Sequence, residues 1–330
     1  MIRMVLYVIA GLIVAIGATL TGMIELGDHS PPPPMNSVDN LPPGFDISGL
    51  PELQRVPARD GTALAYRAYP VEGANAFAVL VHGSTANGAE MHMVAKALQA
   101  SGVAAFAIDM RGHGATGRRG DVDYIGQLDD DVVDFVKAVG PKYPGAKRIL
   151  IGHSSGGGFV LRFAGGPNGD LFDGYVPLSP YLAFDAPTAR APGANSDTWA
   201  RPFVPRIIAL SVLNGLGIPW FQGLPVVAFA VDPAHAANRT VTYSFRLAAS
   251  FQPHRDYLSD VRAITRPTVL LIGANDELFR ADQYAPLLER VQPKLKVEIV
   301  PNVTHMGIVG AASALDAVTG AVRQIAGGKS

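Results

Sequence analysis

The chain has 330 residues, and its 27 lysines and arginines against 28 aspartates and glutamates give a formal net charge of −1. Hydrophobic residues make up 48% of the chain and charged residues 17%, which argues against global disorder. The near-zero charge provides no general attraction for nucleic acid, so we expect no nucleic-acid partner. The absence of cysteine excludes disulfides, thiolate metal sites and cysteine nucleophiles.

The N-terminal segment has the composition of a membrane helix. Residues 4–24 carry no charged side chain, and 21 residues span about 31 Å as a helix, close to the roughly 30 Å of a bilayer core. Arg3 precedes the run, and Glu25 and Asp28 follow it, which favours an N-terminus inside the cytoplasm. We predict that residues 1–27 anchor the chain in a membrane, with the rest outside the cytoplasm (in the periplasm of a Gram-negative bacterium). The alternative is a signal peptide that is cleaved from a secreted protein.

A proline-rich linker follows in residues 28–50. The four prolines at 31–34 favour an extended polyproline II rod, and the alternative is a disordered linker. Either form would hold the following domain away from the membrane.

The remaining pattern alternates apolar strands with helices over residues 51–179 and 251–330. Such strands, separated by helices, predict a mostly parallel sheet that is covered on both faces, with residues 62–69 as a strand at its edge. Residues 180–250 interrupt the rhythm, because they are rich in Pro and Gly and hold both tryptophans. We interpret them as an inserted, mainly helical cap. The further expected strands are 76–81, 103–110, 148–152, 175–178, 268–272 and 297–300, and the expected helices are 89–100, 123–139 and 156–163.

The most informative motif is Gly-His-Ser-Ser-Gly at residues 152–156, between an apolar strand and a helix. This context is typical of a nucleophile elbow, in which a sharp turn presents Ser154 above the sheet and small residues at Gly152 and Gly156 avoid clashes. The alternatives are a glycine-rich turn with a capping serine, or Ser155 as the nucleophile. Ser155 is disfavoured because His153 stands where its motif requires glycine.

A serine hydroxyl needs a base, and in this arrangement an acid and then a histidine follow it along the chain. His305 comes just after the last expected strand, whereas the other two later histidines, His235 and His254, fall in the cap or at its end. Asp276 is the first acid after the strand at 268–272, ahead of its neighbour Glu277. We therefore predict His305 as the base and Asp276 as the acid that orients it.

The loop after the strand at 76–81 is expected to complete an oxyanion hole. It begins with His82 and Gly83, and we assign the backbone N–H of Ser84 as one donor and that of Ser155, at the start of a helix, as the other. Gly83 permits a close turn, and His82 is more consistent with a structural hydrogen bond than with catalysis.

Together with the Asp-Met-Arg-Gly-His-Gly run at 109–114, these motifs resemble the α/β-hydrolase superfamily. They are most similar to its monoacylglycerol lipase and lysophospholipase branch, which is grouped with serine aminopeptidase-like hydrolases. The resemblance covers about residues 64–326 except the cap. It implies the α/β-hydrolase fold, and it implies that Arg111 and His113 support the loops near the site.

The residues and the resemblance together predict a serine ester hydrolase that works through an acyl-enzyme and needs no metal or cofactor. An apolar cap on a membrane-anchored chain favours lipid-like esters such as monoacylglycerols or lysophospholipids. The alternatives are another acyl hydrolase or acyltransferase, acting on a peptide, lactone or cell-envelope ester, and a non-catalytic binding module with a hydrolase-like fold. The cap residues expected to contact substrate are Trp199, Phe203, Trp220 and Phe221.

Overall fold

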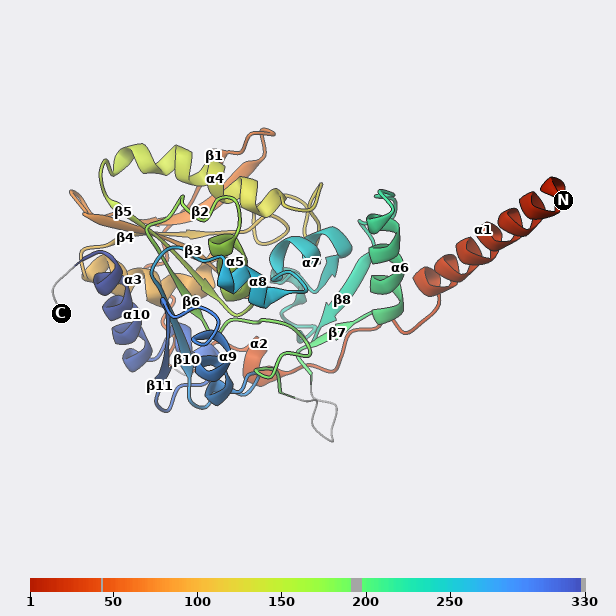
Figure 1. Cartoon of the computed structure of the whole chain (residues 1–330). Coiled ribbons are helices and arrows are strands. Elements are labelled where there is room, and N and C mark those ends of the chain that lie inside the picture. The colour runs from red at the N-terminus through yellow and green to blue at the C-terminus, as the bar shows by residue number, and fades with distance from the viewer. Residues whose placement is uncertain (43, 191–197, 328–330) are drawn as a thin grey trace.

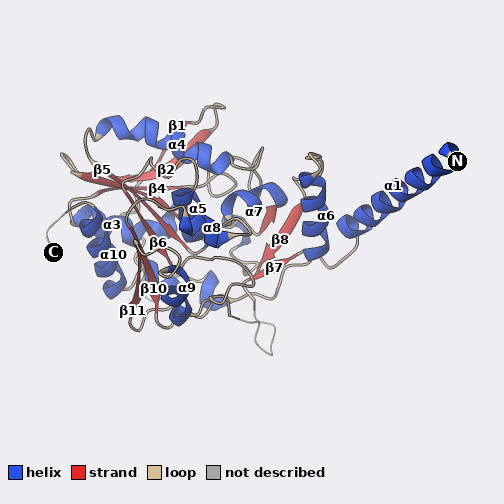
Figure 2. Cartoon of the chain, viewed as in Figure 1, coloured by secondary structure: helices blue, strands red, loops and turns tan. Residues whose placement is uncertain are grey.

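A computed structural model describes residues 1–42, 44–190 and 198–327. Its core is an eight-stranded sheet, parallel throughout except that β2 runs antiparallel to both of its neighbours (Figures 1 and 2). In spatial order the strands are β1 (Leu53–Pro57), β2 (Ala63–Tyr69), β4 (Ala104–Ile108), β3 (Ala76–Val81), β5 (Lys147–His153), β6 (Gly174–Leu178), β10 (Thr268–Gly273) and β11 (Leu295–Val300).

One edge of the sheet differs from the sequence expectation. β2 matches the strand predicted at the edge, but β1 pairs with it and forms the edge itself. The side chains of β1 are half-buried or exposed, so the strand has no apolar pattern that would predict it.

Helices cover both faces of the sheet, as expected for a parallel α/β core (Figure 2). Two helices, α3 (His92–Ala100) and α10 (Ala312–Ile325), bury their apolar faces in one hydrophobic cluster. A second cluster on the opposite face includes α4 (Gln127–Val139), α5 (Ser155–Gly165), α8 (Tyr257–Arg262) and α9 (Tyr284–Leu288). Short 3₁₀ turns lie at Gly88–Met91, Gly140–Lys142, Ala236–Asn238, Ala281–Gln283 and Met306–Val309.

The predicted cap is a mixed unit, so the expectation of a mainly helical insertion is wrong. It contains a three-stranded antiparallel sheet of β7 (Ala200–Pro202), β8 (Pro225–Phe229) and β9 (Thr242–Ser244). It also contains α6 (Val204–Gly215), and α7 (Phe245–Phe251) begins in it and leads back to the core. Two of the strands have only three residues, too few to show the alternation from which a strand is predicted. Residues 191–197 of the predicted cap lie outside the described residues.

The N-terminal helix α1 (Ile2–Glu25) projects away from the core and meets it only at its C-terminal end, beside α6 (Figure 1). It is long and apolar enough to cross a membrane. Ile24 is buried there, and Arg206 of α6 donates a 2.8 Å hydrogen bond from Nε to the carbonyl oxygen of Ile24.

The linker after α1 lies against the domain, which corrects the prediction of a spacer that holds the domain away. It contains one helical turn, α2 (Asn36–Asp39), in which the side chains of Val38 and Asp39 are buried. The backbone N–H of Met35 donates a 2.8 Å hydrogen bond to the carbonyl oxygen of Ala230 in the insertion. The prolines therefore keep the segment extended while it runs along the protein surface.

Candidate active site

Ser154 occupies the turn between β5 and α5 with a φ of +53°, a left-handed conformation that non-glycine residues rarely adopt. The turn is compact enough to exclude any side chain at its flanks. A Cβ on Gly152 would clash with the carbonyl oxygen of Gly156, and a Cβ on Gly156 would clash with that of His82. The two glycines of the motif are therefore required by packing, and the strained backbone raises the serine above the sheet.

His305 and Asp276 reach Ser154 from loops that follow the neighbouring strands β11 and β10. Nε2 of His305 lies 3.1 Å from Oγ of Ser154, and Nδ1 lies 2.9 Å from Oδ2 of Asp276. The other carboxylate oxygen of Asp276 accepts hydrogen bonds from the backbone N–H groups of Leu278 and Phe279, at 2.9 and 2.8 Å. All three predicted residues are buried, and they form one continuous chain of hydrogen bonds.

The charges of this pair stabilise one another. Burial alone would lower the pKa of His305, but the Asp276 carboxylate outweighs it, and the pKa is raised above its ordinary value. Burial alone would raise the pKa of Asp276, but His305 and the backbone donors lower it. The other candidates have other partners among the described residues: His235 bonds Asp39, His254 bonds Asp260, and Glu277 accepts from the backbone N–H of His305.

Two backbone N–H groups near Ser154 are available for an oxyanion. In the loop after β3, Gly83 donates to Oε1 of Glu90 at 2.7 Å and Thr85 donates to the hydroxyl of Tyr243 at 3.0 Å. These bonds fix the loop on both sides of Ser84. Within the described parts of the chain, the N–H of Ser84 and the N–H of Ser155 have no hydrogen-bond acceptor, so both stay free to stabilise negative charge.

Glu90 joins three loops of the site and was not predicted from the sequence. Besides accepting from Gly83, its Oε1 accepts a 2.9 Å hydrogen bond from Nδ1 of His153. Nε2 of His153 lies 3.2 Å from the carbonyl oxygen of His305. Burial alone would raise the pKa of Glu90, but His153 and the other donors lower it to about 2, so the carboxylate is charged. The pair therefore connects the oxyanion loop, the elbow and the histidine loop.

The predicted supporting residues His82 and His113 form hydrogen bonds that stabilise the structure around the site. His82 accepts a 3.1 Å hydrogen bond from the backbone N–H of Met110, and burial lowers its pKa. His113 is fully buried, with a pKa well below its ordinary value because of burial, and its Nε2 accepts from the hydroxyl of Tyr243 at 2.6 Å. The hydroxyl of Tyr243 also holds the oxyanion loop, so His113 supports that loop through it.

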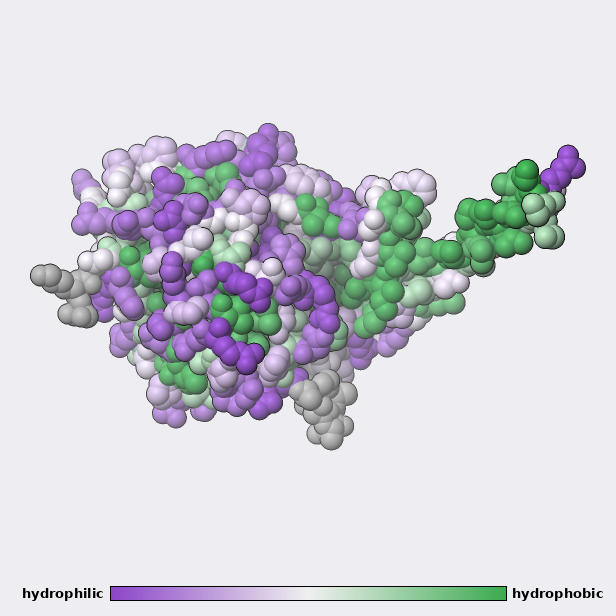
Figure 3. All heavy atoms as spheres, in the orientation of Figure 1, coloured by the Kyte–Doolittle hydropathy of each residue, from purple (hydrophilic) through white to green (hydrophobic). Residues whose placement is uncertain are grey.

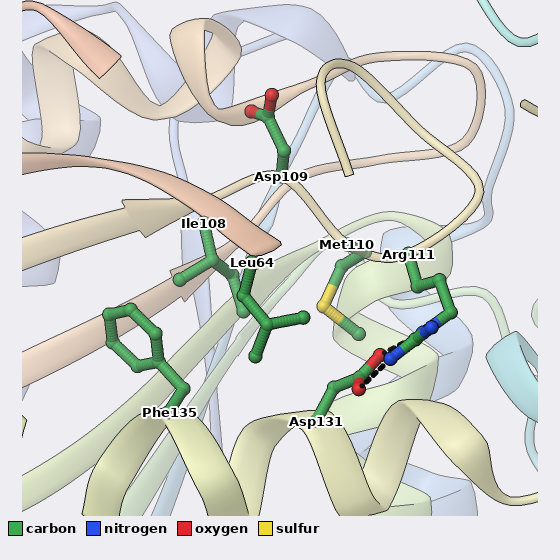
Figure 4. Close-up of a pocket in the computed structure, with 7 residues that line it drawn as sticks. All are labelled: Leu64, Ile108, Asp109, Met110, Arg111, Asp131 and Phe135. Atoms are coloured by element: carbon green, nitrogen blue, oxygen red, sulfur yellow. Dashed lines mark hydrogen bonds and ion pairs between the residues drawn. The ribbon is translucent and has the colours of Figure 1, made fainter. Parts of the chain in front are cut away.

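Arg111 lies farther out, where it pairs with Asp131 of α4 at 2.8 and 2.7 Å. Figure 4 shows this pair beside a cavity of about 10 Å³ on the α4 side of the sheet. Its other lining residues are mostly apolar, which indicates a packing void rather than a binding site: Leu64, Ile108, Asp109, Met110 and Phe135.

A second cavity, also about 10 Å³, contains Ser154 and has room for about one water molecule. Of the four aromatic residues expected to contact substrate, only Trp199 lines it, and the indole Nε1 donates a 2.8 Å hydrogen bond to Oγ of Ser84. Phe203 is buried against His29, whereas Trp220 and Phe221 are exposed after α6. The complete lining is Val38, Gly83, Ser84, Thr85, Glu90, His153, Ser154, Trp199, Arg239, His305 and Met306.

Comparison with known proteins shows the family of the chain. Residues 73–309 match the family model described as serine aminopeptidase, S33. A monoacylglycerol lipase from Mycolicibacterium smegmatis is 26% identical over 247 residues, covering 69% of this chain and 80% of the relative. A monoglyceride lipase homolog from Monkeypox virus is 29% identical over 119 residues, covering 36% of this chain and 42% of the relative.

Solved structures share the fold at low identity. A soluble variant of monoglyceride lipase from Saccharomyces cerevisiae superposes with a TM-score of 0.61 at 20% identity, covering 86% of this chain and 97% of that one. A monoacylglycerol lipase from Paleococcus ferrophilus gives 0.59 at 20% identity, with 80% and 98% covered. The chain therefore has the α/β-hydrolase fold, belongs to the serine aminopeptidase S33 family, and is a serine hydrolase of the carboxylic ester hydrolase class.

Proposed function

We propose that the protein hydrolyses lipid-like esters through an acyl-enzyme on Ser154. His305 removes the hydroxyl proton as the oxygen attacks the ester carbonyl, and the backbone N–H groups of Ser84 and Ser155 stabilise the oxyanion. The imidazolium then donates its proton to the leaving alcohol. A water molecule, deprotonated by the same His305, releases the acid and restores the serine.

The observation that carries this proposal is the hydrogen-bonded order of Ser154, His305 and Asp276 beside two free N–H donors. Asp276 accepts from Nδ1 of His305, which leaves Nε2 as the acceptor that faces the serine hydroxyl. This tautomer is the one that a general base requires. A binding module would have no need for it.

Lipid-like substrates are favoured by the relatives and by the surface of the insertion. Both sequence relatives are named as monoglyceride or monoacylglycerol lipases. Figure 3 shows a hydrophobic surface that continues from α1 onto α6. On α6 and the turns after it, the exposed apolar side chains are Val204, Ile208, Val212, Leu216, Trp220 and Phe221. We propose that this face lies at the membrane surface.

Labelling with a fluorophosphonate tests the nucleophile. Wild type is expected to form a stable adduct, and Ser154→Ala is expected to form none. Ser155→Ala is the matched control, because it keeps the backbone N–H and the elbow, and it should still label. Labelling that persists in Ser154→Ala, or is absent from wild type, would refute the enzyme proposal.

A series of aryl esters with increasing acyl length tests the substrate class. We expect kcat/KM to rise from short to long chains, because each buried methylene contributes about 0.8 kcal/mol to binding. Activity confined to the shortest esters would instead favour another acyl hydrolase.

The anchor and its orientation are proposals of the same kind. We propose that α1 spans the membrane and that the catalytic domain lies outside the cytoplasm, with secretion after signal cleavage as the alternative. Full-length protein should stay with membranes in alkaline carbonate, and a protease added outside spheroplasts should reach the domain. Release of the full-length chain by carbonate would refute the anchor.

A further inference from the structure

We propose that residues 35–39, in the linker between α1 and the α/β core, form a strap that belongs to the substrate site and moves aside when an ester binds. This inference rests on the proposed function, because it concerns access to Ser154. We call these residues, Met35 to Asp39, the strap.

The first observation is that the site has little space for a substrate. The cavity at Ser154 holds about one water molecule, and 6% of the serine is exposed. An ester with even a short acyl chain needs far more space, so part of the lining must move before catalysis.

The residues that line the cavity limit which segment can move. Gly83, Ser84, Glu90, His153 and His305 are held in the network that the chemistry requires, so they cannot be displaced without loss of the site. The remaining contacts come mainly from the insertion, through Trp199 and Arg239, and from the strap, through Val38.

The insertion is fastened to the core near the site. The backbone N–H of Thr240 donates to the carbonyl oxygen of Thr85 at 2.9 Å, and the hydroxyl of Thr240 donates to that of Gly112 at 3.0 Å. Arg246 holds Asp121 with two hydrogen bonds of 2.8 and 2.7 Å. Moving the whole insertion would break these bonds and disturb the oxyanion loop as well.

The strap is held chiefly by one carboxylate. Oδ2 of Asp39 accepts from Nδ1 of His235 at 2.7 Å and from the backbone N–H of Asp232 at 3.0 Å, and Arg239 donates to the Asp39 carbonyl oxygen at 2.9 Å. The other oxygen, Oδ1, is buried and accepts no hydrogen bond among the described residues, and its ion pair with Nε of Arg239 is long, at 3.7 Å. A buried, incompletely satisfied carboxylate stabilises a contact less than an apolar side chain would.

The position of the strap in the chain gives it a link to the membrane. It begins ten residues after α1 ends at Glu25, and before it Asp28 and His29 contact Arg201 and Arg206 of the insertion. Beyond the strap, the carbonyl oxygen of Ser48 faces Nε2 of His92 at 3.1 Å. The strap therefore lies between two fixed points and can swing out without leaving the protein.

Hydrogen exchange of the wild-type chain in phosphatidylcholine nanodiscs tests the inference directly. Exchange is measured by mass spectrometry before and after Ser154 is labelled with a long-chain alkyl fluorophosphonate. The strap amides are expected to exchange at least about tenfold faster in the adduct, equivalent to a shift of about 1.4 kcal/mol. Unchanged exchange in residues 35–39 of the labelled protein would overturn the strap, even though labelling itself upheld the enzyme proposal.

The rate at which the probe labels an Asp39 variant provides the second measurement. Asp39→Ala removes the carboxylate, and we expect the long-chain probe to label it about tenfold faster than wild type. Asp46→Ala is the control, since Asp46 lies in the same linker and, within the described part of the chain, bonds Ser48 and Lys96 rather than the insertion. If Asp39→Ala does not fold, Asp39→Asn should give a smaller increase. Equal labelling rates in wild type and the folded Asp39 variant would overturn the strap proposal. If no protein were labelled at all, the proposed function would be refuted instead.

Discussion

The indole of Trp199 donates a hydrogen bond of 2.8 Å to Oγ of Ser84. This bond joins the insertion to the loop after β3, in which Ser84 lines the same cavity as Ser154. If Ser84 is an oxyanion donor, as we propose, a change in the insertion should alter the rate of the chemical step.

Replacing Trp199 with Phe keeps most of the ring and removes the donor. We expect kcat to fall about three- to tenfold, because one neutral hydrogen bond contributes roughly 0.5–1.5 kcal/mol and here acts on the oxyanion donor. Steady-state kinetics on a soluble aryl ester measures this loss. Trp220→Phe is the control, since Trp220 is 68% exposed. A wild-type kcat in Trp199→Phe would show that Ser84 needs no support from the insertion.

The pH dependence of activity follows from the raised pKa of His305. The base must be neutral, so kcat/KM should increase with pH through a pKa above the ordinary histidine value, because the Asp276 carboxylate stabilises the imidazolium. In Asp276→Asn this carboxylate is lost, and burial then lowers the pKa. The acidic limb should move to lower pH while kcat falls about 10⁴-fold. If the acidic limb of the pH profile did not move, the titration of another group would control it.

Glu90 is expected to affect catalysis without touching the substrate. Glu90→Gln removes the negative charge opposite His153 but keeps a side-chain oxygen that can accept from Gly83 and His153, so both hydrogen bonds lose their charge assistance. We expect kcat to fall about tenfold with little change in KM, and the free energy of unfolding to fall by about 1–3 kcal/mol. Glu298→Gln, on the exposed side of β11, is the matched control. If only stability changed, Glu90 would have no positioning role.

The sequence predicts three residues that the structure brings together, Ser154, His305 and Asp276, because their signals are local. The elbow at 152–156 needs two glycines within five residues, and the acid and base each follow an apolar strand directly. Parallel strands end at one edge of the sheet, so residues placed after β10 and β11 come together there. The order of Ser154, Asp276 and His305 along the chain can be predicted from these facts alone.

The supporting contacts could not be predicted, because they join segments that no local pattern relates. Glu90 and His153 are 63 residues apart, and Asp39 and His235 are 196 apart. A buried carboxylate in a polar loop resembles a surface residue in the sequence. The proline-rich linker likewise has the composition of a spacer, although its one turn of helix buries Val38 beside Ser154.

The ion pair between Arg111 and Asp131 should contribute to stability rather than to catalysis. Both side chains are more than nine-tenths buried, at 4% and 8% exposure. Asp131→Ala leaves the guanidinium with a hydrogen bond to Thr62 and with Asp60 and Asp123 as acidic partners, of which Asp123 is largely exposed. Removing one member of a buried pair costs about 3–5 kcal/mol, and thermal unfolding should show a loss approaching this size. Asp130→Ala, which breaks a pair with the half-exposed Arg59, should cost less than about 1 kcal/mol. Because Arg111 has no contact with Ser154, folded Asp131→Ala should keep its fluorophosphonate reactivity, and a loss of labelling below the unfolding temperature would show that this pair also organises the site.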